Sequence, residues 1–144
     1  MVRGLNIQRE ESAIEDDVSK RDAQSLQDSY RKIFQTMSEG FVLHEIVYDE
    51  NGEHYDLRIL DANPAFELQT GLRREDILGR TFKQVLPDED PLLAKTLSQV
   101  ALTGKPTKFK TYSRSLGRFY DIIAYSPAPL HVAVLFSDVT KKRS

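Results

Sequence analysis

Apolar side chains repeat at helical spacing between residues 23 and 37. Five of them alternate intervals of three and four residues: Ala23, Leu26, Tyr30, Ile33 and Met37. This spacing places side chains on one face of an α-helix. Ser12 followed by Glu15 is typical of a capping box, and Gly40 is suited to end a helix. We therefore expect an amphipathic helix over residues 12–38, preceded by an irregular tail at residues 1–11.

The apolar face occupies only the C-terminal half of this helix, because the same spacing falls on Ser19, Asp16 and Ser12 farther upstream. A stripe of this kind is typical of a helix that pairs with another copy. We expect dimer contacts from Leu26, Tyr30, Ile33 and Met37. A solvated helix without a partner is the alternative, since isolated helices are only marginally stable in water.

Two strand-like segments follow, residues 41–48 and 55–62, joined by the sequence "DENGEH". Its Asn-Gly pair is the strongest short signal for a β-hairpin. If this pair lies at the centre of the loop, Glu45 faces Arg58 as an opposite-charge pair. The same register places His44 on the side of the strand that carries the apolar residues.

Prolines preceded by side chains that cap helices mark the middle of the chain. Asn63 and the proline after it predict a short helix that ends at Gly71, and Asp90 with its proline predicts a longer helix. Another short helix is expected over residues 73–78. Four apolar residues form one stripe on the longer helix: Leu93, Leu97, Val100 and Ala101. We expect this stripe to pack against another element of the domain.

The last forty residues have the pattern of three strands, at about residues 107–114, 118–125 and 131–139. The short connections "SLG" and "SPAP" favour an antiparallel meander. Apolar residues occupy both faces of the last strand, so we expect it to be central and covered on both sides.

Composition narrows the function classes. A chain of 144 residues with 40% hydrophobic residues is long enough for one domain with a core. Its 20 basic and 22 acidic residues give a net charge of −2, which does not favour nucleic acid or an anionic membrane. There are no cysteines, no apolar run long enough to span a membrane, and no catalytic motif. We expect a cytoplasmic, soluble domain that is not an enzyme and makes no membrane contact.

Three motifs occur in a recognisable order. They are "YRKIFQTMSEGFVLHEIVYDENG", "DANPAFELQTGLRREDILGR" and "LFSDVT". With the expected elements they resemble the PAS sensor domain over residues 30–140. The resemblance implies an α+β fold with a five-stranded antiparallel sheet in the order 2-1-5-4-3 and short helices on one face. We assign the domain to residues 39–140 and the start of a C-terminal linker to residues 141–144.

In this family the Asp-x-Thr motif commonly leads into a linker to an output domain, such as a histidine kinase or a diguanylate cyclase. The resemblance therefore implies a signal-transmitting joint at Asp138, Val139 and Thr140. The alternative is that Asp138 or Thr140 only caps the turn that follows, and a cap could also set the angle of the outgoing chain.

No cofactor is identified by these residues. Family members that form a flavin adduct need an Asn-Cys-Arg motif, whereas this chain has "LRREDILG" after Gly71 and no cysteine. Haem-binding members usually place a histidine on the longer helix, and "DPLLAKTLSQVALTG" contains none. His44 and His54 fall on opposite faces of the hairpin, so they cannot share a metal ion. A small molecule bound without a covalent bond remains open.

A ligand cavity between the short helices and the sheet would be lined by residues that point inward. The candidates are Phe66, Phe82, Leu93, Leu97, Tyr112, Phe119, Asp121, Ile123 and Tyr125, with Asp121 the polar group among them. The alternative is a core in which these side chains fill the space. The function expected is a homodimeric sensor that relays a signal to an output domain, and the alternative is a ligand-free dimerisation scaffold.

Overall fold

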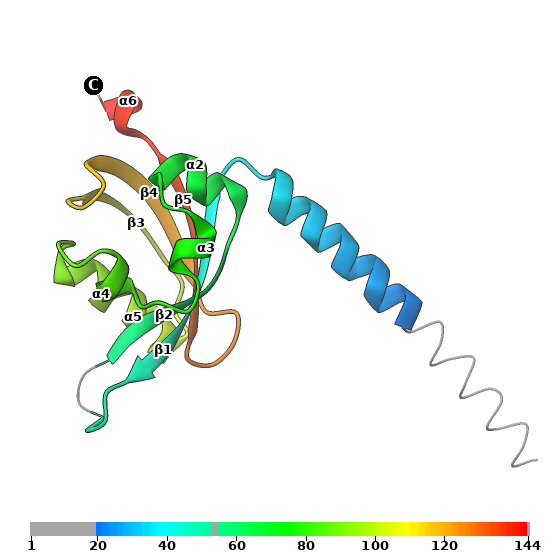
Figure 1. The fold of residues 1–144 in the computed structure, drawn as a ribbon, viewed down its shortest axis with the longest axis horizontal. Coiled ribbons are helices and arrows are strands. Elements are labelled where there is room, and N and C mark those ends of the chain that lie inside the picture. The colour runs from blue at the N-terminus through cyan, green and yellow to red at the C-terminus, as the bar shows by residue number, and fades with distance from the viewer. Residues whose placement is uncertain (1–19, 53–54, 144) are drawn as a thin grey trace, which may run out of the picture. The chain divides into compact units, whose positions relative to one another are not determined.

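The computed structural model describes residues 20–52 and 55–143. The chain divides into two compact units, residues 1–35 and 36–144. In the first unit, the described residues form one helix that continues to residue 36 (Figure 1). Its predicted beginning at residues 12–19, and the tail expected before it, lie outside the described residues.

The second unit is built on a five-stranded antiparallel sheet in the order β2-β1-β5-β4-β3. The strands are β1 (Gly40–Tyr48), β2 (Tyr55–Ala62), β3 (Thr107–Ser113), β4 (Arg118–Tyr125) and β5 (His131–Asp138). The strand order that the resemblance implied is confirmed, and β5 lies at the centre of the sheet (Figure 1).

The hairpin register is also confirmed, because Glu45 pairs with Arg58 across β1 and β2 with a carboxylate–guanidinium distance of 3.5 Å. The strands end earlier than a two-residue loop would require, at Tyr48 and Tyr55. Gly52 has φ 69° in the connecting turn, where its amide donates to the carbonyl of Asp49. The Asn-Gly signal thus identified the centre of the loop and the register together.

Four helices connect β2 to β3: α2 (Pro64–Thr70), α3 (Arg74–Ile77), α4 (Phe82–Val85) and α5 (Pro91–Thr103). As predicted, Asn63 caps α2 by accepting from the amide of Phe66, and Asp90 caps α5 by accepting from the amide of Leu92. Helix α4 has a capping box between Thr81 and Gln84 that was not predicted. Helix α6 (Thr140–Arg143) begins just after β5.

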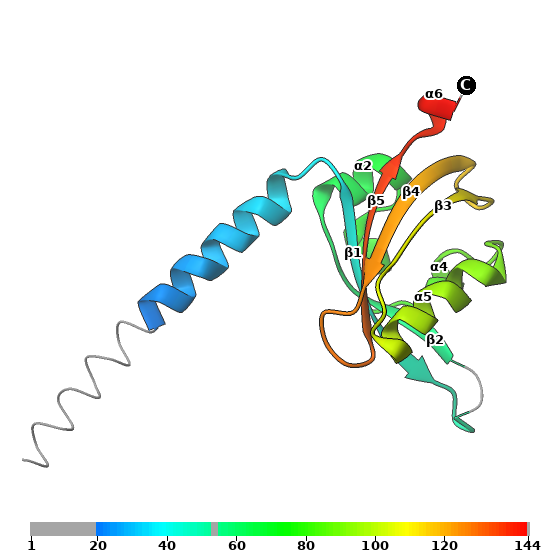
Figure 2. The ribbon, with the colours of Figure 1, turned by 180° about the vertical axis from the view of Figure 1, so that it is seen from behind.

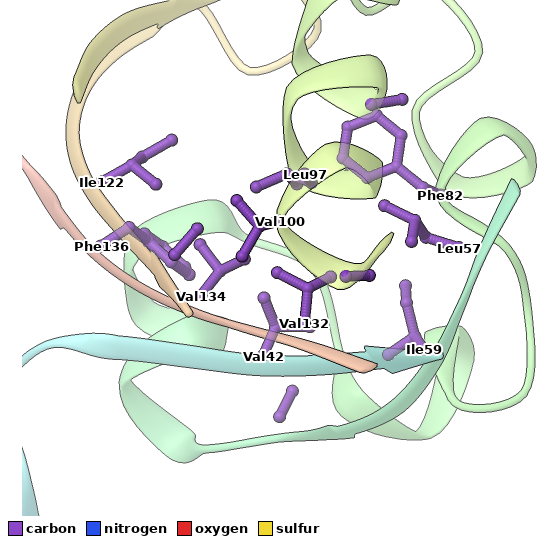
Figure 3. Packing of buried hydrophobic residues seen from close by; sticks show 14 of the residues in the cluster. Val42, Leu57, Ile59, Phe82, Leu97, Val100, Ile122, Val132, Val134 and Phe136 are labelled. Carbon is purple, nitrogen blue, oxygen red and sulfur yellow. The ribbon is translucent and has the colours of Figure 1, made fainter. Parts of the chain in front are cut away.

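Helices α4 and α5 lie over one face of the sheet (Figure 2). That face and helices α2–α5 share a single hydrophobic core. The α5 stripe packs there, with Leu97, Val100 and Ala101 no more than 4% exposed. Figure 3 shows Leu97 and Val100 beside Val134 and Val132 of the central strand. Burial of such side chains contributes about 1.5–3 kcal/mol each, so this layer supplies much of the stability of the domain.

Apolar side chains also lie on the opposite face of the sheet, but they are less buried. Tyr112, Ile123 and Tyr125 are 36–50% exposed there. In β5, Val132 and Val134 contact the core under the helices, whereas Ala133 points to the other face and is 1% exposed. Leu135, on the same face as Ala133, is only half-buried, so the last strand is covered along its helical face and the expected cover on the other face is met at Ala133 alone.

Candidate ligand cavity and linker joint

Helices α2, α4 and α5 and the inner face of the sheet enclose a cavity of about 90 Å³ that is partly open to solvent. Four of the predicted residues line it from the helical side: Phe66, Phe82, Leu93 and Leu97. The sheet contributes Ile122 from β4 and Phe136 from β5. The ring of Phe136 contacts Phe66 edge to face, with centroids 5.7 Å apart, so aromatic packing fixes this wall of the cavity.

The strand side of the predicted set is wrong by one residue. Tyr112, Phe119, Asp121, Ile123 and Tyr125 do not line the cavity, and their strand neighbours Thr111, Ser113, Tyr120 and Ile122 do. Successive side chains in a strand point to opposite faces, so a shift of one residue reverses the whole set. Both faces of β4 carry aromatic and aliphatic residues, which left the pattern without a preferred face.

Asp121 therefore lies on the outer face of the sheet. Its ion-pair partner among the described residues is Lys110 on β3, at 3.9 Å. Tyr112 and Phe119 face each other across β3 and β4 on the same outer face, with ring centroids 4.8 Å apart. Any ligand bound by these residues would be at the outer surface of the sheet, not in the cavity.

His44 lies in the cavity wall and is only 2% exposed. Burial lowers the pKa of its imidazole to about 4, although the backbone of Val132 and the charge of Asp56 act in the opposite direction. Among the described residues, no hydrogen-bond partner meets its Nδ1 atom. The ring is neutral at physiological pH, and it contacts Phe82 at a centroid distance of 6.4 Å.

Glu89, in the segment between α4 and α5, is a buried member of the wall that the sequence did not indicate. Its carboxylate accepts a short hydrogen bond from the Ser113 hydroxyl and another, at 2.8 Å, from the amide of Arg114. It thereby joins the segment before α5 to the end of β3. No local pattern could have indicated it, since it is one of three acidic residues in "PDEDP".

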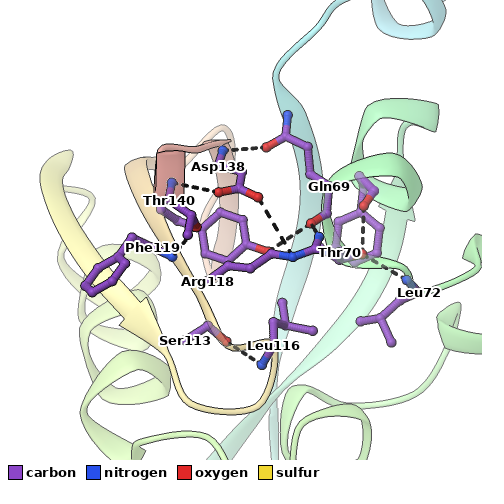
Figure 4. A network of polar contacts seen from close by, with 11 residues as sticks. Gln69, Thr70, Leu72, Ser113, Leu116, Arg118, Phe119, Asp138 and Thr140 are labelled. Atoms are coloured by element: carbon purple, nitrogen blue, oxygen red, sulfur yellow. Dashed lines mark hydrogen bonds and ion pairs between the residues drawn. The ribbon is translucent and has the colours of Figure 1, made fainter. Parts of the chain in front are cut away.

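The C-terminal end of α2 is held against β4. The Gln69 carbonyl accepts a hydrogen bond from the Arg118 guanidinium (Figure 4). It also accepts one, at 3.0 Å, from the Tyr120 hydroxyl. The last carbonyls of a helix have no partner within it, so these donors satisfy one of them and place a cation at the end of the helix. Burial raises the pKa of Tyr120, although the nearby Arg118 acts against this, so the hydroxyl remains protonated and can donate.

The side-chain amide of the same residue contacts both ends of the domain. Gln69 Nε2 donates to the Ser38 carbonyl at 2.8 Å, and its Oε1 accepts from the Asp138 amide, also at 2.8 Å. Ser38 lies just before β1 and Asp138 ends β5. One side chain thus joins the segments that lead into and out of the domain, which no sequence motif indicated.

The three predicted joint residues lie together at the end of the sheet. The Asp138 carboxylate accepts from the Thr140 amide, and the Thr140 hydroxyl accepts from the Phe119 amide, both at 2.9 Å (Figure 4). Val139 is buried, and its amide donates to the Phe119 carbonyl. Hydrogen bonds from Thr140, and then the charge of Arg118, lower the pKa of Asp138. Their role in signalling stays a prediction.

The predicted dimer residues are exposed on the N-terminal helix. Leu26, Tyr30 and Ile33 have exposed fractions of 59%, 69% and 60%, and Met37, beyond the end of the helix, is half-buried. The structure holds one chain, so dimerisation stays a prediction. In the described part of the chain, no group of three or more potential metal ligands occurs, and no helix has the length and apolar character needed to cross a membrane.

One known protein family matches the sequence of this chain. A family model described as the PAS fold matches residues 46–133, more than half of the chain. A comparison with the curated proteins found no match.

Several solved structures share the fold. An RNA-binding light-oxygen-voltage receptor has a TM-score of 0.62 and 18% identity over 84% of this chain, which spans only 35% of that receptor. A domain of a sensory box sensor histidine kinase/response regulator from Geobacter sulfurreducens gives a TM-score of 0.55 at 18% identity, over 78% of this chain and 94% of the other. The PAS domain of nitrogen regulation protein NR(II) from Vibrio parahaemolyticus gives 0.52 at 18% identity, over 74% and 94%. At such identities the likeness shows the fold alone.

Proposed function

This chain belongs to the PAS family, and from that premise we propose that it is a regulatory sensor module. A small ligand in the cavity, or a partner, changes the position of α2 and thereby the two ends of the domain. The change passes to an attached output domain, such as a histidine kinase or a diguanylate cyclase. PAS domains are generally sensory rather than catalytic, and a cytoplasmic location and a homodimeric state are parts of the same proposal.

The position of Gln69 carries the proposal. Phe66 and Thr70, on either side of it in α2, line the cavity, while Gln69 bonds to Ser38 and Asp138. A ligand that moves this helix therefore changes hydrogen bonds at the beginning and the end of the domain in one step. A relay of this kind needs two arrangements that the ligand binds with different affinity. The fold neighbours support the output class, since one of them is a domain of a sensor histidine kinase.

Native and denatured mass spectrometry of the purified chain, with a visible spectrum, tests the occupied cavity. We expect a small molecule that is released on denaturation, and no flavin or haem absorption band. The molecule should be small, because pockets for drug-sized ligands usually measure about 300–1,000 Å³ and this cavity measures about 90 Å³. A chain without extra mass that also fails to take up small probes would contradict the ligand-sensing role.

A ligand-free dimerisation scaffold is the second candidate. The exposed stripe of Leu26, Tyr30 and Ile33 favours it, because dimerisation through this helix would need no ligand. A dimer that forms at low concentration and whose cavity excludes every small probe would support the scaffold. A dimer that binds probes supports the sensor.

A further inference from the structure

The surface of the cavity is almost entirely carbon, although several polar side chains lie in its wall. The polar atoms of those side chains are directed to partners within the protein. The Thr70 hydroxyl donates to the Phe66 carbonyl at 2.7 Å, and the Tyr120 hydroxyl donates to the Gln69 carbonyl at 3.0 Å. A ligand in the cavity therefore meets the carbon atoms of these residues, and their hydroxyl hydrogens are already used.

The buried carboxylate of Glu89 also accepts hydrogen bonds from groups within the protein. One carboxylate oxygen accepts from the Ser113 hydroxyl, and the other accepts from the amides of Arg114 and Asp90, at 2.8 and 3.3 Å. The Ser113 hydroxyl accepts in turn from the Leu116 amide at 3.2 Å. Each oxygen of this carboxylate already accepts a hydrogen bond within the protein, so a ligand donor would have to compete with these partners for it.

The Nδ1 atom of His44 is not available to form a hydrogen bond with a ligand either. This atom is shut off from solvent and so from the open part of the cavity. Thr111, half-buried on β3, is the wall residue whose hydroxyl has no partner among the described residues, so a ligand hydroxyl that reaches it could bond there. It can be tested by substitution.

We propose that the cavity binds a small, uncharged, apolar ligand of about the size of one six-membered ring and discriminates against its polar analogues. This rests on the proposed function of the cavity as a ligand site. An engineered apolar cavity of about 150 Å³ stays dry and binds benzene, so about 90 Å³ with an opening to solvent, where a substituent of the ring can extend, suits a ligand of that class. A buried hydroxyl without a partner weakens binding by roughly ten- to hundredfold, and a carboxylate by more.

Toluene, phenol and benzoate, titrated into the purified chain, separate the possibilities because they share one ring and differ in polarity. The methyl NMR signals of Leu97 and Val134, in the wall, report binding. We expect toluene to shift both signals saturably, phenol to need at least tenfold higher concentration, and benzoate to have no effect. Phenol binding as tightly as toluene would overturn the ligand class and leave the cavity as a ligand site. If no probe shifts either signal, the ligand-sensing part of the proposed function fails as well, and sensing of a partner is what remains.

Variants connect the binding to the cavity. Leu97→Phe fills the space and should abolish the toluene shift at Val134, whereas Leu102→Phe, at a 43% exposed position of the same helix, should retain it. If Leu97→Phe does not fold, Leu93→Phe provides the same test from a half-buried position in the wall. Thr111→Val should leave toluene binding unchanged and weaken the residual phenol binding. Toluene binding that persists in both filled variants would place it outside the cavity and overturn the proposal.

Discussion

Two helices of this chain carry a similar apolar stripe and differ in what covers it. In α5, Leu97, Val100 and Ala101 are 2–4% exposed, because the sheet packs against them. In the helix at residues 20–36, Leu26, Tyr30 and Ile33 are 59–69% exposed. Periodicity predicts that a helix has a face to bury, and it does not identify the surface that buries it.

The difference gives the two helices separate roles. Helix α5 belongs to the core and to the cavity wall, so substitutions there should change the stability of the domain. The N-terminal helix is exposed, and the cover that we propose for it is the same helix of a second copy. Substitutions there should change the assembly of the chain and leave the folding of the domain nearly unchanged.

The largest effect is expected for Leu97→Ala in α5. Removal of a buried leucine side chain leaves a void, so the free energy of unfolding should fall by about 2–5 kcal/mol. Urea denaturation measures this loss. Leu102→Ala, at an exposed position of the same helix, is the control and should change it by less than about 0.5 kcal/mol. Equal losses for the two variants would mean that the α5 stripe is not buried as described.

The pH dependence of the free energy of unfolding tests whether water reaches His44 in the cavity wall. The pKa of His44 is about 4 in the folded chain and near 6.5 when unfolded, so the unfolded chain binds more protons between these values. The contribution of the neutral imidazole is complete above about pH 6.5. It is lost as the pH falls toward 4, by roughly 3 kcal/mol.

His44→Leu should remove this share of the pH dependence, and His131→Asn, at a partly exposed position in β5, should retain it. Urea denaturation between pH 4 and 7 compares the three proteins. The same slope in His44→Leu as in the wild type would show that the histidine is hydrated.

A smaller loss is expected for Gly40→Ala, at the start of β1. A Cβ atom there would lie 2.3 Å from the Phe136 ring, which is itself packed edge to face on Tyr120. Such overpacking costs about 1–3 kcal/mol. In a double-mutant cycle with Phe136→Leu, the cost of Gly40→Ala should decrease, because the smaller side chain makes room. Additive losses would contradict this contact.

The smallest effect on folding is expected for Ile33→Asp in the N-terminal helix. The free energy of unfolding of the domain should change by less than about 0.5 kcal/mol, since Ile33 is 60% exposed. In analytical ultracentrifugation the mass should fall from that of a dimer to that of a monomer. Gln35→Asp adds the same charge at an exposed position outside the stripe and should remain dimeric. An unchanged mass for Ile33→Asp would remove the proposed interface.

The features that could be predicted from the sequence are those set by residues close together in the chain. The Asn-Gly turn and the caps at Asn63 and Asp90 depend on neighbouring residues only, and the hairpin register and the start of α2 and α5 were predicted correctly from them. The residues on the helical side of the cavity were also predicted from the local sequence, namely from the positions of apolar residues in the helices. The strand side was not, since Tyr120 and Ile122 alternate with Phe119 and Ile123 and either face could have been buried.

The contacts that join the cavity to the ends of the domain depend on the tertiary structure. Gln69 lies 31 residues from Ser38 and 69 residues from Asp138 along the chain. A glutamine in a short helix has no pattern that indicates such partners. The hydrogen bonds of Arg118 and Tyr120 to the Gln69 carbonyl likewise depend on the packing of α2 against β4.

The amide NMR signal of Asp138 during a toluene titration tests the relay most directly. Its amide donates to Gln69 Oε1, so its shift should saturate together with the cavity signal of Leu97. Gln69→Met should retain binding and lose the Asp138 response, whereas Leu68→Met, at the exposed neighbouring position, should keep both. Saturation of Leu97 with an unchanged Asp138 signal in the wild type would contradict a relay from the cavity to the end of the domain.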